Sequence, residues 1–225
     1  MAYKVLDSNL RSCHGGEAQW TVGQKKSVEG DLVPCEKGIH VCRDERDVLS
    51  WIGEVICPCE HSEEYIDRAT KRVVRWACIG EPNPYWNERT ARHFACDCAE
   101  FALPYAQDDQ RELLQAVVDI ARAYADRPEE WAEERKAAQD SARDALAIVA
   151  AGAAAEAAIW AAVDAAGAAG DVAWGAAWAA ARAAALNAAV DVAQAAGATA
   201  RDDLAAILAT YLDGTNEWLT IAEND

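Results

Sequence analysis

An alanine-rich stretch from residue 145 to residue 197 carries a few large or charged side chains at regular spacing. The spacing of four between Trp174, Trp178 and Arg182 places these side chains on one face of an α-helix. Indole rings stack on nucleobases for about 1–3 kcal/mol per base, a guanidinium pairs with phosphate, and carboxylates accept hydrogen bonds from hydroxyls. We therefore predict a ligand-binding face, called the Trp stripe, that consists of Trp160, Asp164, Asp171, Trp174, Trp178 and Arg182.

The Trp stripe has a second interpretation, in which its indoles pack against the N-terminal part of the chain or against a second subunit. Alanine faces bury little apolar area per residue, so pairing across a two-fold axis would add burial, and we expect a homo-oligomer. The sequence leaves pocket, interface and core open for this stripe.

Cysteine and histidine side chains cluster in the N-terminal part of the chain, where they suggest a metal site. Zinc takes four Cys or His ligands, and Cys-x-Cys on a strand points both sulfurs to one face. The paired Cys-x-x-Cys knuckle is missing, so we expect small buried side chains, with zinc as the alternative. The candidate ligands are Cys35, His40, Cys42, Cys57, Cys59 and His61.

Two further groups of residues have types suited to chemistry. Cys13 and His14 are neighbours flanked by glycine, which would suit a nucleophile and its base, although no orienting acid or elbow motif accompanies them. Asp97 and Glu100 are three residues apart in an expected helix, so their carboxylates can converge on a cation or base, or form a solvated edge. We expect no catalytic residues.

The charge balance restricts the classes of partner. Lys plus Arg is 21 and Asp plus Glu is 38, which gives a net charge of −17. Such a surface repels nucleic acid and anionic membrane. Charged residues interrupt the alanine-rich stretch before about 20 uncharged residues accumulate, so we expect no membrane span. Met1 is followed by no apolar segment typical of an export signal, which favours a cytoplasmic protein.

The elements that must position these residues divide the chain into two parts. We predict an α+β fold, with a small antiparallel or mixed sheet domain over residues 1–82 and an alanine-rich multi-helix domain over residues 83–225. Strands are expected at 3–6, 19–22, 54–60 and 71–79, and a short helix at 44–51 with Asp44 as its N-cap. Asn83 is expected to cap the first long helix, and Asp108 to open the next one.

Two stretches resemble known families. Residues 3–80 are similar to an uncharacterised phage and bacterial domain through Trp20-x-Val22-Gly23 and Cys35-Glu36-x-Gly38-Ile39-His40-x-Cys42, where that family usually has Phe in place of Ile39. Residues 88–200 resemble an alanine-rich helical toxin-immunity family through Asp97-Cys98-Ala99-Glu100 and Leu103-Pro104, with Phe101 where Arg is expected. The first resemblance implies a phage or prophage setting and supplies no established activity; the second implies binding and neutralisation without chemistry.

The resulting hypothesis is a phage-associated cytoplasmic binding protein that acts through its helical domain on a toxin or a host defence protein. One alternative is a sponge that sequesters a nucleotide-like immune signal at the Trp stripe. Another is an enzyme in the N-terminal domain, either Cys-dependent or ADP-ribosyltransferase-like, although no catalytic Glu motif can be assigned.

Overall fold

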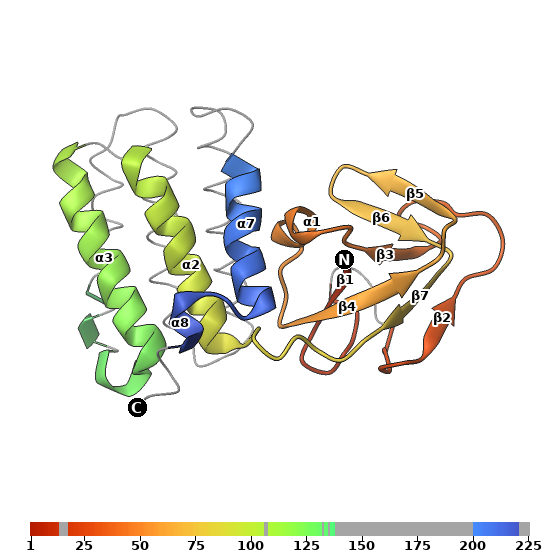
Figure 1. Ribbon diagram of the computed structural model, residues 1–225, viewed down its shortest axis with the longest axis horizontal. Coiled ribbons are helices and arrows are strands. Elements are labelled where there is room, and N and C mark those ends of the chain that lie inside the picture. Colours follow the sequence, from red (N-terminus) through yellow and green to blue (C-terminus); the bar gives the residue numbers. More distant parts are fainter. Residues whose placement is uncertain (14–17, 106–107, 132, 135, 138–199, 221–225) are drawn as a thin grey trace. The chain divides into compact units, whose positions relative to one another are not determined.

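The computed structural model describes residues 1–13, 18–105, 108–131, 133–134, 136–137 and 200–220 (Figure 1). The chain forms two compact units, Met1–Trp86 and Asn87–Asp225, which we call the sheet unit and the helical unit. The sheet unit holds every described strand, and the long helices lie in the helical unit, so the predicted α+β fold is confirmed.

Two antiparallel sheets make up the sheet unit (Figure 1). The four-stranded sheet has the order β1 (Ala2–Leu6), β4 (Val55–His61), β7 (Trp76–Ile79) and β2 (Lys25–Ser27). The three-stranded sheet has the order β3 (Ile39–Val41), β6 (Lys71–Val74) and β5 (Tyr65–Arg68). Tyr3 and Cys42 exchange two backbone hydrogen bonds of 2.8 Å, which join β1 to the end of β3. This bridge brings side chains of β1 and β3 next to each other.

One buried hydrophobic cluster of the sheet unit consists of side chains from its strands together with Trp20. Its buried members are Leu6, Trp20, Val41, Cys57, Cys59, Val74, Ala77 and Ile79. Leu6 points into this core, and the two-residue period of a strand therefore turns Lys4 toward the same interior.

Several predicted strands are wrong in detail. Residues 19–22 form no strand; Gln19 makes a single bridge with Arg11. The predicted strand 71–79 is two strands in different sheets, because the chain leaves β6 at Arg75 and re-enters as β7. Arg75 donates its backbone N–H to the Ser62 hydroxyl at 2.9 Å instead of to a ladder partner. Strand β5 was not predicted, because its polar residues give no apolar alternation.

The helix α1 (Glu45–Leu49) confirms the helix expected at 44–51, and Asp44 caps it by accepting a hydrogen bond from the Asp47 backbone N–H at 3.1 Å. The first long helix, α2 (Glu88–Ala102), is capped by Asn87 rather than by the expected Asn83. Asn87 and Thr90 form a reciprocal capping box, whereas the Asn83 side chain accepts from the backbone of Tyr85 and Trp86 in a turn.

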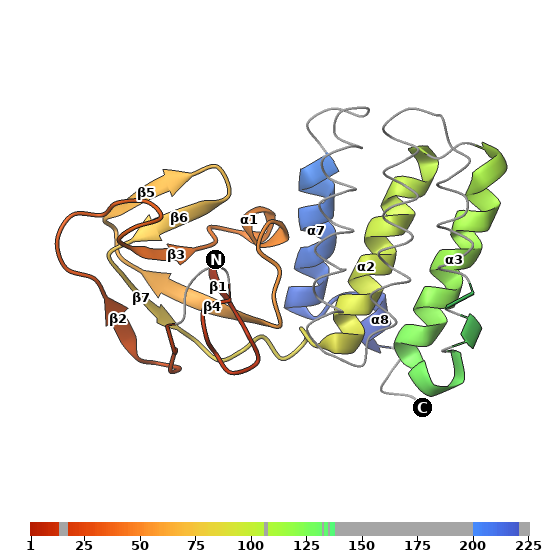
Figure 2. The same cartoon turned by 180° about the vertical axis from the view of Figure 1, so that it is seen from behind.

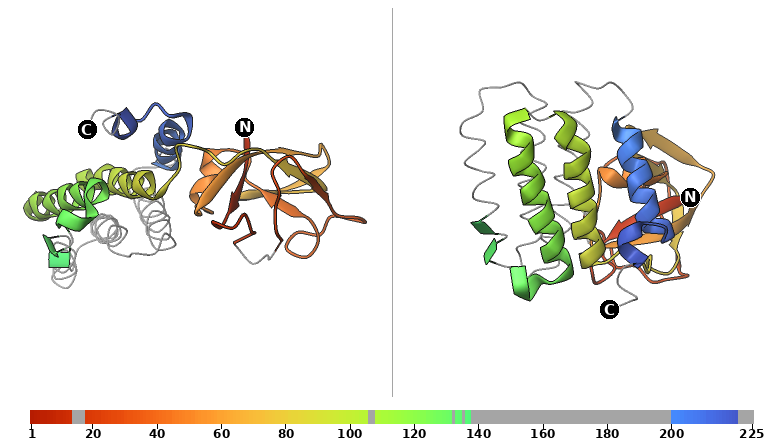
Figure 3. Two further views of the ribbon diagram at one scale, coloured as in Figure 1. Left: turned by 90° about the horizontal axis from the view of Figure 1, so that it is seen from below. Right: turned by 60° about the vertical axis from the view of Figure 1, so that its left-hand side comes forward.

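In the helical unit, α2 lies between α3 (Asp108–Asp126) and α7 (Ala200–Asp213), and it also contacts the short helix α8 (Glu217–Thr220) (Figures 2 and 3). A 3-10 turn, η1 (Leu103–Tyr105), follows α2. Phe94 of α2 packs edge-to-face on Tyr211 of α7, and both side chains are fully buried. The expected start of a helix at Asp108 is confirmed, and in this helix Leu114 is fully buried whereas Leu113 is 40% exposed.

Candidate functional site

A cavity of about 280 Å³ opens in the sheet unit, at the point where β1 meets β3 and β6. Its wall combines indole and aliphatic side chains with two lysines, an imidazole and three thiols. The polar and aromatic members are Lys4, Ser12, Cys13, Trp20, Cys35, Glu36, His40, Cys42, Trp51 and Lys71. This size lies near the lower end of pockets that bind small molecules.

Lys4 contributes a buried ammonium group to this cavity. Its side chain is only 8% exposed, and Nζ donates a 2.8 Å hydrogen bond to the backbone carbonyl of His40. The Trp20 ring centroid lies 5.2 Å from Nζ, within the range of a cation–π contact. Burial lowers the pKa of the Lys4 ammonium, because the charged form loses hydration. An ammonium has three N–H donors, and within the described part of the chain the His40 carbonyl takes only one of them.

Lys71 supplies the second ammonium group of the cavity. Its Nζ lies 3.5 Å from His40 Nδ1, 3.9 Å from Cys35 Sγ and 4.9 Å from the centroid of the Trp51 ring. Burial, with Lys71 and Lys4 nearby, lowers the pKa of His40 to about 4. The imidazole is therefore neutral near pH 7, and its Nδ1 can accept from Lys71. Both lysines contact the same residue, His40, one through its carbonyl and one through its ring.

The polar partners of these two lysines are unusual for so acidic a chain. Among the described residues, neither Lys4 nor Lys71 forms an ion pair with a carboxylate, although the sequence contains 38 acidic residues. A carbonyl, a ring nitrogen, a thiol and two indole faces take that place. Two ammonium groups against the one carboxylate of Glu36 leave the cavity lining with an excess of positive charge, which a bound anion would balance.

Burial keeps two of the thiols that line the cavity, those of Cys13 and Cys42, protonated at neutral pH. Burial raises the pKa of the Cys13 thiol, and it raises that of Cys42 to about 12. Because the thiolate is the reactive form of cysteine, these environments oppose nucleophilic attack by sulfur. Cys13 therefore lacks the activation that the Cys-dependent enzyme hypothesis requires, and its expected partner His14 lies outside the described residues.

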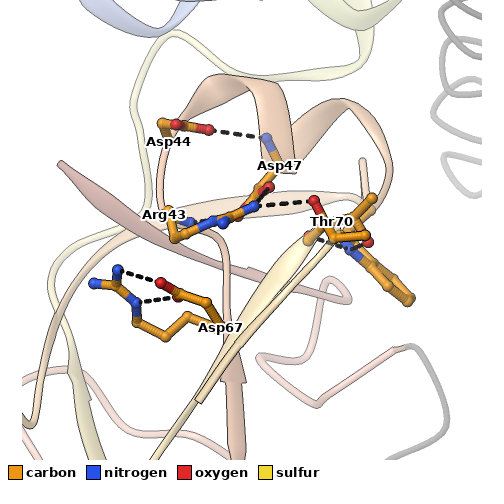
Figure 4. A network of polar contacts seen from close by, with 8 residues as sticks. Arg43, Asp44, Asp47, Asp67 and Thr70 are labelled. Carbon is orange, nitrogen blue, oxygen red and sulfur yellow. Dashed lines mark hydrogen bonds and ion pairs between the residues drawn. The ribbon is translucent and has the colours of Figure 1, made fainter. Parts of the chain in front are cut away.

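A polar network holds the turn between β5 and β6 next to α1 (Figure 4). Arg43 pairs with the buried Asp47 through two contacts of 2.6 and 2.7 Å and donates to the Ala69 carbonyl at 3.0 Å. Trp51 Nε1 donates to the Thr70 carbonyl at 2.8 Å. Since Lys71 follows Thr70 directly, the network sets the position of both Trp51 and Lys71 at the cavity wall.

The fold explains why position 38 of the Cys35–Cys42 segment is a glycine. Its φ is 148°, and a Cβ added there would lie 2.3 Å from Val73 Cγ1. A glycine is therefore required for β3 to approach β6 closely beside the cavity.

The fold places some of the predicted metal ligands in the buried core and others at the cavity. Cys57 and Cys59 belong to the buried core, and burial raises their thiol pKa values to about 11 and about 12. His61 Nδ1 lies 2.7 Å from the Ser62 carbonyl. Cys35, His40 and Cys42 do line one cavity, but within the described part of the chain no three His, Cys, Asp or Glu side chains are placed to hold a metal ion.

The candidate pair Asp97 and Glu100 converges on an internal cation. Arg122 of α3 lies 2.8 Å from Asp97 Oδ1 through Nη1 and 2.8 Å from Glu100 Oε1 through Nη2. The second oxygen of Asp97 accepts from the Tyr211 hydroxyl at 2.6 Å. Burial raises the pKa of Asp97, against the opposing influence of Tyr211 and Arg122. These contacts join α2, α3 and α7, so Asp97 and Glu100 have a role in helix packing.

The Trp stripe cannot be placed, because Trp160, Asp164, Asp171, Trp174, Trp178 and Arg182 all lie outside the described residues. The sequence reasoning missed Lys4, Lys71, Trp20 and Trp51 as site residues. One signal was present for Lys4: it occupies an interior position of a strand between Tyr3 and Val5, where a charged residue is rarely buried. No local signal links Lys4 to Lys71, because their proximity depends on sheet pairing.

Residues 1–77 match the sequence family described as a domain of unknown function (DUF7666). The predicted resemblance of the N-terminal part to an uncharacterised domain is therefore confirmed, while the match ends before the helical unit. Neither the curated proteins nor the solved structures contain a match to this chain. Among the helices that the structure describes, none combines the length and apolarity needed to cross a membrane.

Proposed function

We propose that the sheet unit is a binding module for a small organic anion, a molecule with one carboxylate or phosphate group and an apolar body. The observation that carries this proposal is the pair of ammonium groups at the cavity wall, neither of which has a carboxylate partner among the described residues. The apolar body would contact Trp20, Ile39 and Trp51, which line the same cavity.

Electrostatics favour an anion over a neutral or cationic ligand. Burial lowers the pKa of Lys4, which means that the charged form of this side chain is destabilised in the ligand-free protein. A carboxylate next to Nζ would stabilise the charged form and draw a proton onto Lys4. Anion affinity should therefore fall as the pH rises through the Lys4 pKa in the free protein.

The test uses benzoate as the probe and benzamide, its neutral counterpart of the same shape, as the matched ligand control. Titration of the full chain by isothermal calorimetry should give a benzoate Kd of about 1 mM, equivalent to about 4 kcal/mol, as is usual for a small ligand. Benzamide should bind at least about tenfold more weakly, since it lacks the charge. Equal binding of the two probes, or no binding of benzoate, would refute the proposal.

Matched variants locate the binding. Lys4→Met and Lys71→Met remove one ammonium each, and each should weaken benzoate binding at least about tenfold. Lys25→Met is the control, because Lys25 also lies over an indole, 4.0 Å from the Trp76 centroid, but does not line the cavity. Benzoate affinity that survives both cavity substitutions would place the anion elsewhere. Circular dichroism of each variant checks the fold.

The helical domain and the phage setting belong to a separate prediction. Neutralisation of a toxin or a host defence protein, or capture of a nucleotide-like signal, was predicted from residues 145–197 and from the resemblance over residues 88–200. Residues 138–199 lie outside the described part of the chain, so these predictions, the homo-oligomer and the cytoplasmic location depend on the sequence alone.

A further inference from the structure

We propose that the anion bound by this cavity is a small oxo acid, and that Lys4 forms a reversible imine with its aldehyde or ketone carbon while Lys71 pairs with its carboxylate. This inference rests on the proposed function, because it names the ligand class of the same cavity. Its geometric basis is that two amines flank one residue: Lys4 Nζ is 2.8 Å from the His40 carbonyl, and Lys71 Nζ is 3.5 Å from His40 Nδ1. Because both amines contact His40, one amine can reach the carbonyl carbon of a ligand while the other pairs with an adjacent carboxylate of the same ligand.

Lys4 has the environment of a nucleophilic amine. It is buried in a cavity wall with a second cation nearby and, among the described residues, no carboxylate holds it in the charged form. Desolvation and a neighbouring ammonium are the two influences that activate lysine for imine formation. The titratable or charged groups that act on Lys4 are Cys13, His40, Cys42, Cys59 and Lys71, and the same cavity is also lined by Cys35 and Glu36.

At neutral pH, the neighbouring groups of Lys4 do not compete with it as nucleophiles for the carbonyl carbon. Burial raises the pKa of Cys42 and of Cys59 to about 12, so both thiols stay protonated. The pKa of His40 is about 4, so its ring is neutral and leaves the positive charge to the lysines. Of the Lys4 amine and the Cys42 and Cys59 thiols, the amine is the group that its surroundings make more nucleophilic.

Imine formation between Lys4 and the oxo acid requires no oxidant and no metal ion. The Lys4 ammonium first loses one proton to solvent. The nitrogen lone pair then forms a C–N bond with the carbonyl carbon, and the carbonyl π electrons move to oxygen. The two remaining N–H hydrogens leave with that oxygen as water, and a C=N bond remains. Hydrolysis reverses the step and releases the oxo acid, so the cavity would hold the ligand covalently but reversibly.

The experiment traps the imine with cyanoborohydride, using pyruvate as the probe and lactate as the control that has a hydroxyl in place of the carbonyl. Reduction of the imine gives a stable secondary amine that blocks tryptic cleavage after Lys4, so the Met1–Lys4 peptide is replaced by one extending to Arg11. This readout separates Lys4 from the Met1 α-amine, whose modification leaves that cleavage intact. We expect pyruvate-dependent loss of cleavage after Lys4, at least about tenfold faster than modification of Lys25, and none with lactate.

Two further arms distinguish failure of this inference from failure of the anion proposal. Lys4→Arg keeps the positive charge but forms no imine, so trapping at this position should be lost, while benzoate should bind this variant more tightly than it binds Lys4→Met. Benzoate should protect wild-type Lys4 from pyruvate, and trapping should increase with pH while benzoate affinity decreases. Benzoate binding with Lys4 modified no faster than Lys25 would overturn the imine and leave the anion proposal standing. Absence of both would overturn both. Peptide mapping of the wild-type chain decides the question even if Lys4→Arg does not fold.

Discussion

The Tyr211 hydroxyl donates a 2.6 Å hydrogen bond to Asp97 Oδ2, between residues 114 positions apart in the sequence. Arg122 occupies the other carboxylate oxygen at 2.8 Å. A buried aspartate is thereby shared by a phenol from α7 and a guanidinium from α3. This arrangement turns a pair of acids expected at a binding edge into an internal junction of the helical unit.

Tyr211→Phe should lower the free energy of unfolding of the full chain by about 1–3 kcal/mol, because it leaves one oxygen of the buried Asp97 without its donor. Chemical denaturation followed by far-UV circular dichroism measures this difference. Glu100→Gln is the matched control within the same junction. The Glu100 side chain is 41% exposed, so the change should be about 0.5 kcal/mol or less. Equal effects of the two substitutions would contradict a packing role centred on Asp97.

Lys4→Met should fold and be more stable than the wild type by roughly 0.5–2 kcal/mol at pH 7, because it removes a charge from a buried position. The difference should shrink as the pH rises. The folded-state pKa of Lys4 lies below its ordinary 10.5, so between these two values the unfolded chain binds more protons than the folded one. In this pH window, the free energy of unfolding of the wild type therefore rises with pH relative to that of the variant. Parallel urea titrations of both proteins from pH 7 to pH 10 measure the trend; a difference that stays constant or widens would contradict it.

A fragment of residues 1–86 should be more stable than a fragment of residues 1–82. The additional Trp86 is buried, and its Nε1 donates a 3.0 Å hydrogen bond to the Gly53 carbonyl in the sheet unit. Loss of a buried tryptophan costs about 3–5 kcal/mol. Thermal unfolding of the two fragments, purified in parallel, compares them. If both melt at the same temperature, Trp86 contributes nothing to the sheet unit and the boundary predicted at residue 82 is the better one.

Local patterns were sufficient where a few neighbouring residues determine the structure. Asp44 with Glu45–Leu49 predicted α1 correctly, because an N-cap needs only a side-chain acceptor and a backbone N–H three residues later. Alternating or β-branched side chains predicted β1 and β4 for a similar reason. At Asn83, the local pattern did not predict the structure. The Asn83 side chain accepts backbone hydrogen bonds as a cap would, yet they close a turn, and the helix begins after Asn87.

The sequence by itself determined the α+β class, the division of composition along the chain and the acidity of the surface, because these depend on residue type and short-range period. Tertiary structure alone decided which residues meet. Lys4 reaches His40 only because Tyr3 and Cys42 bridge two sheets, and Lys71 reaches the same histidine because β6 pairs with β3. Asp97 meets Tyr211 only through the packing of α7 on α2. Contacts between residues distant in sequence depend on the pairing of whole elements, and no local spacing encodes that pairing.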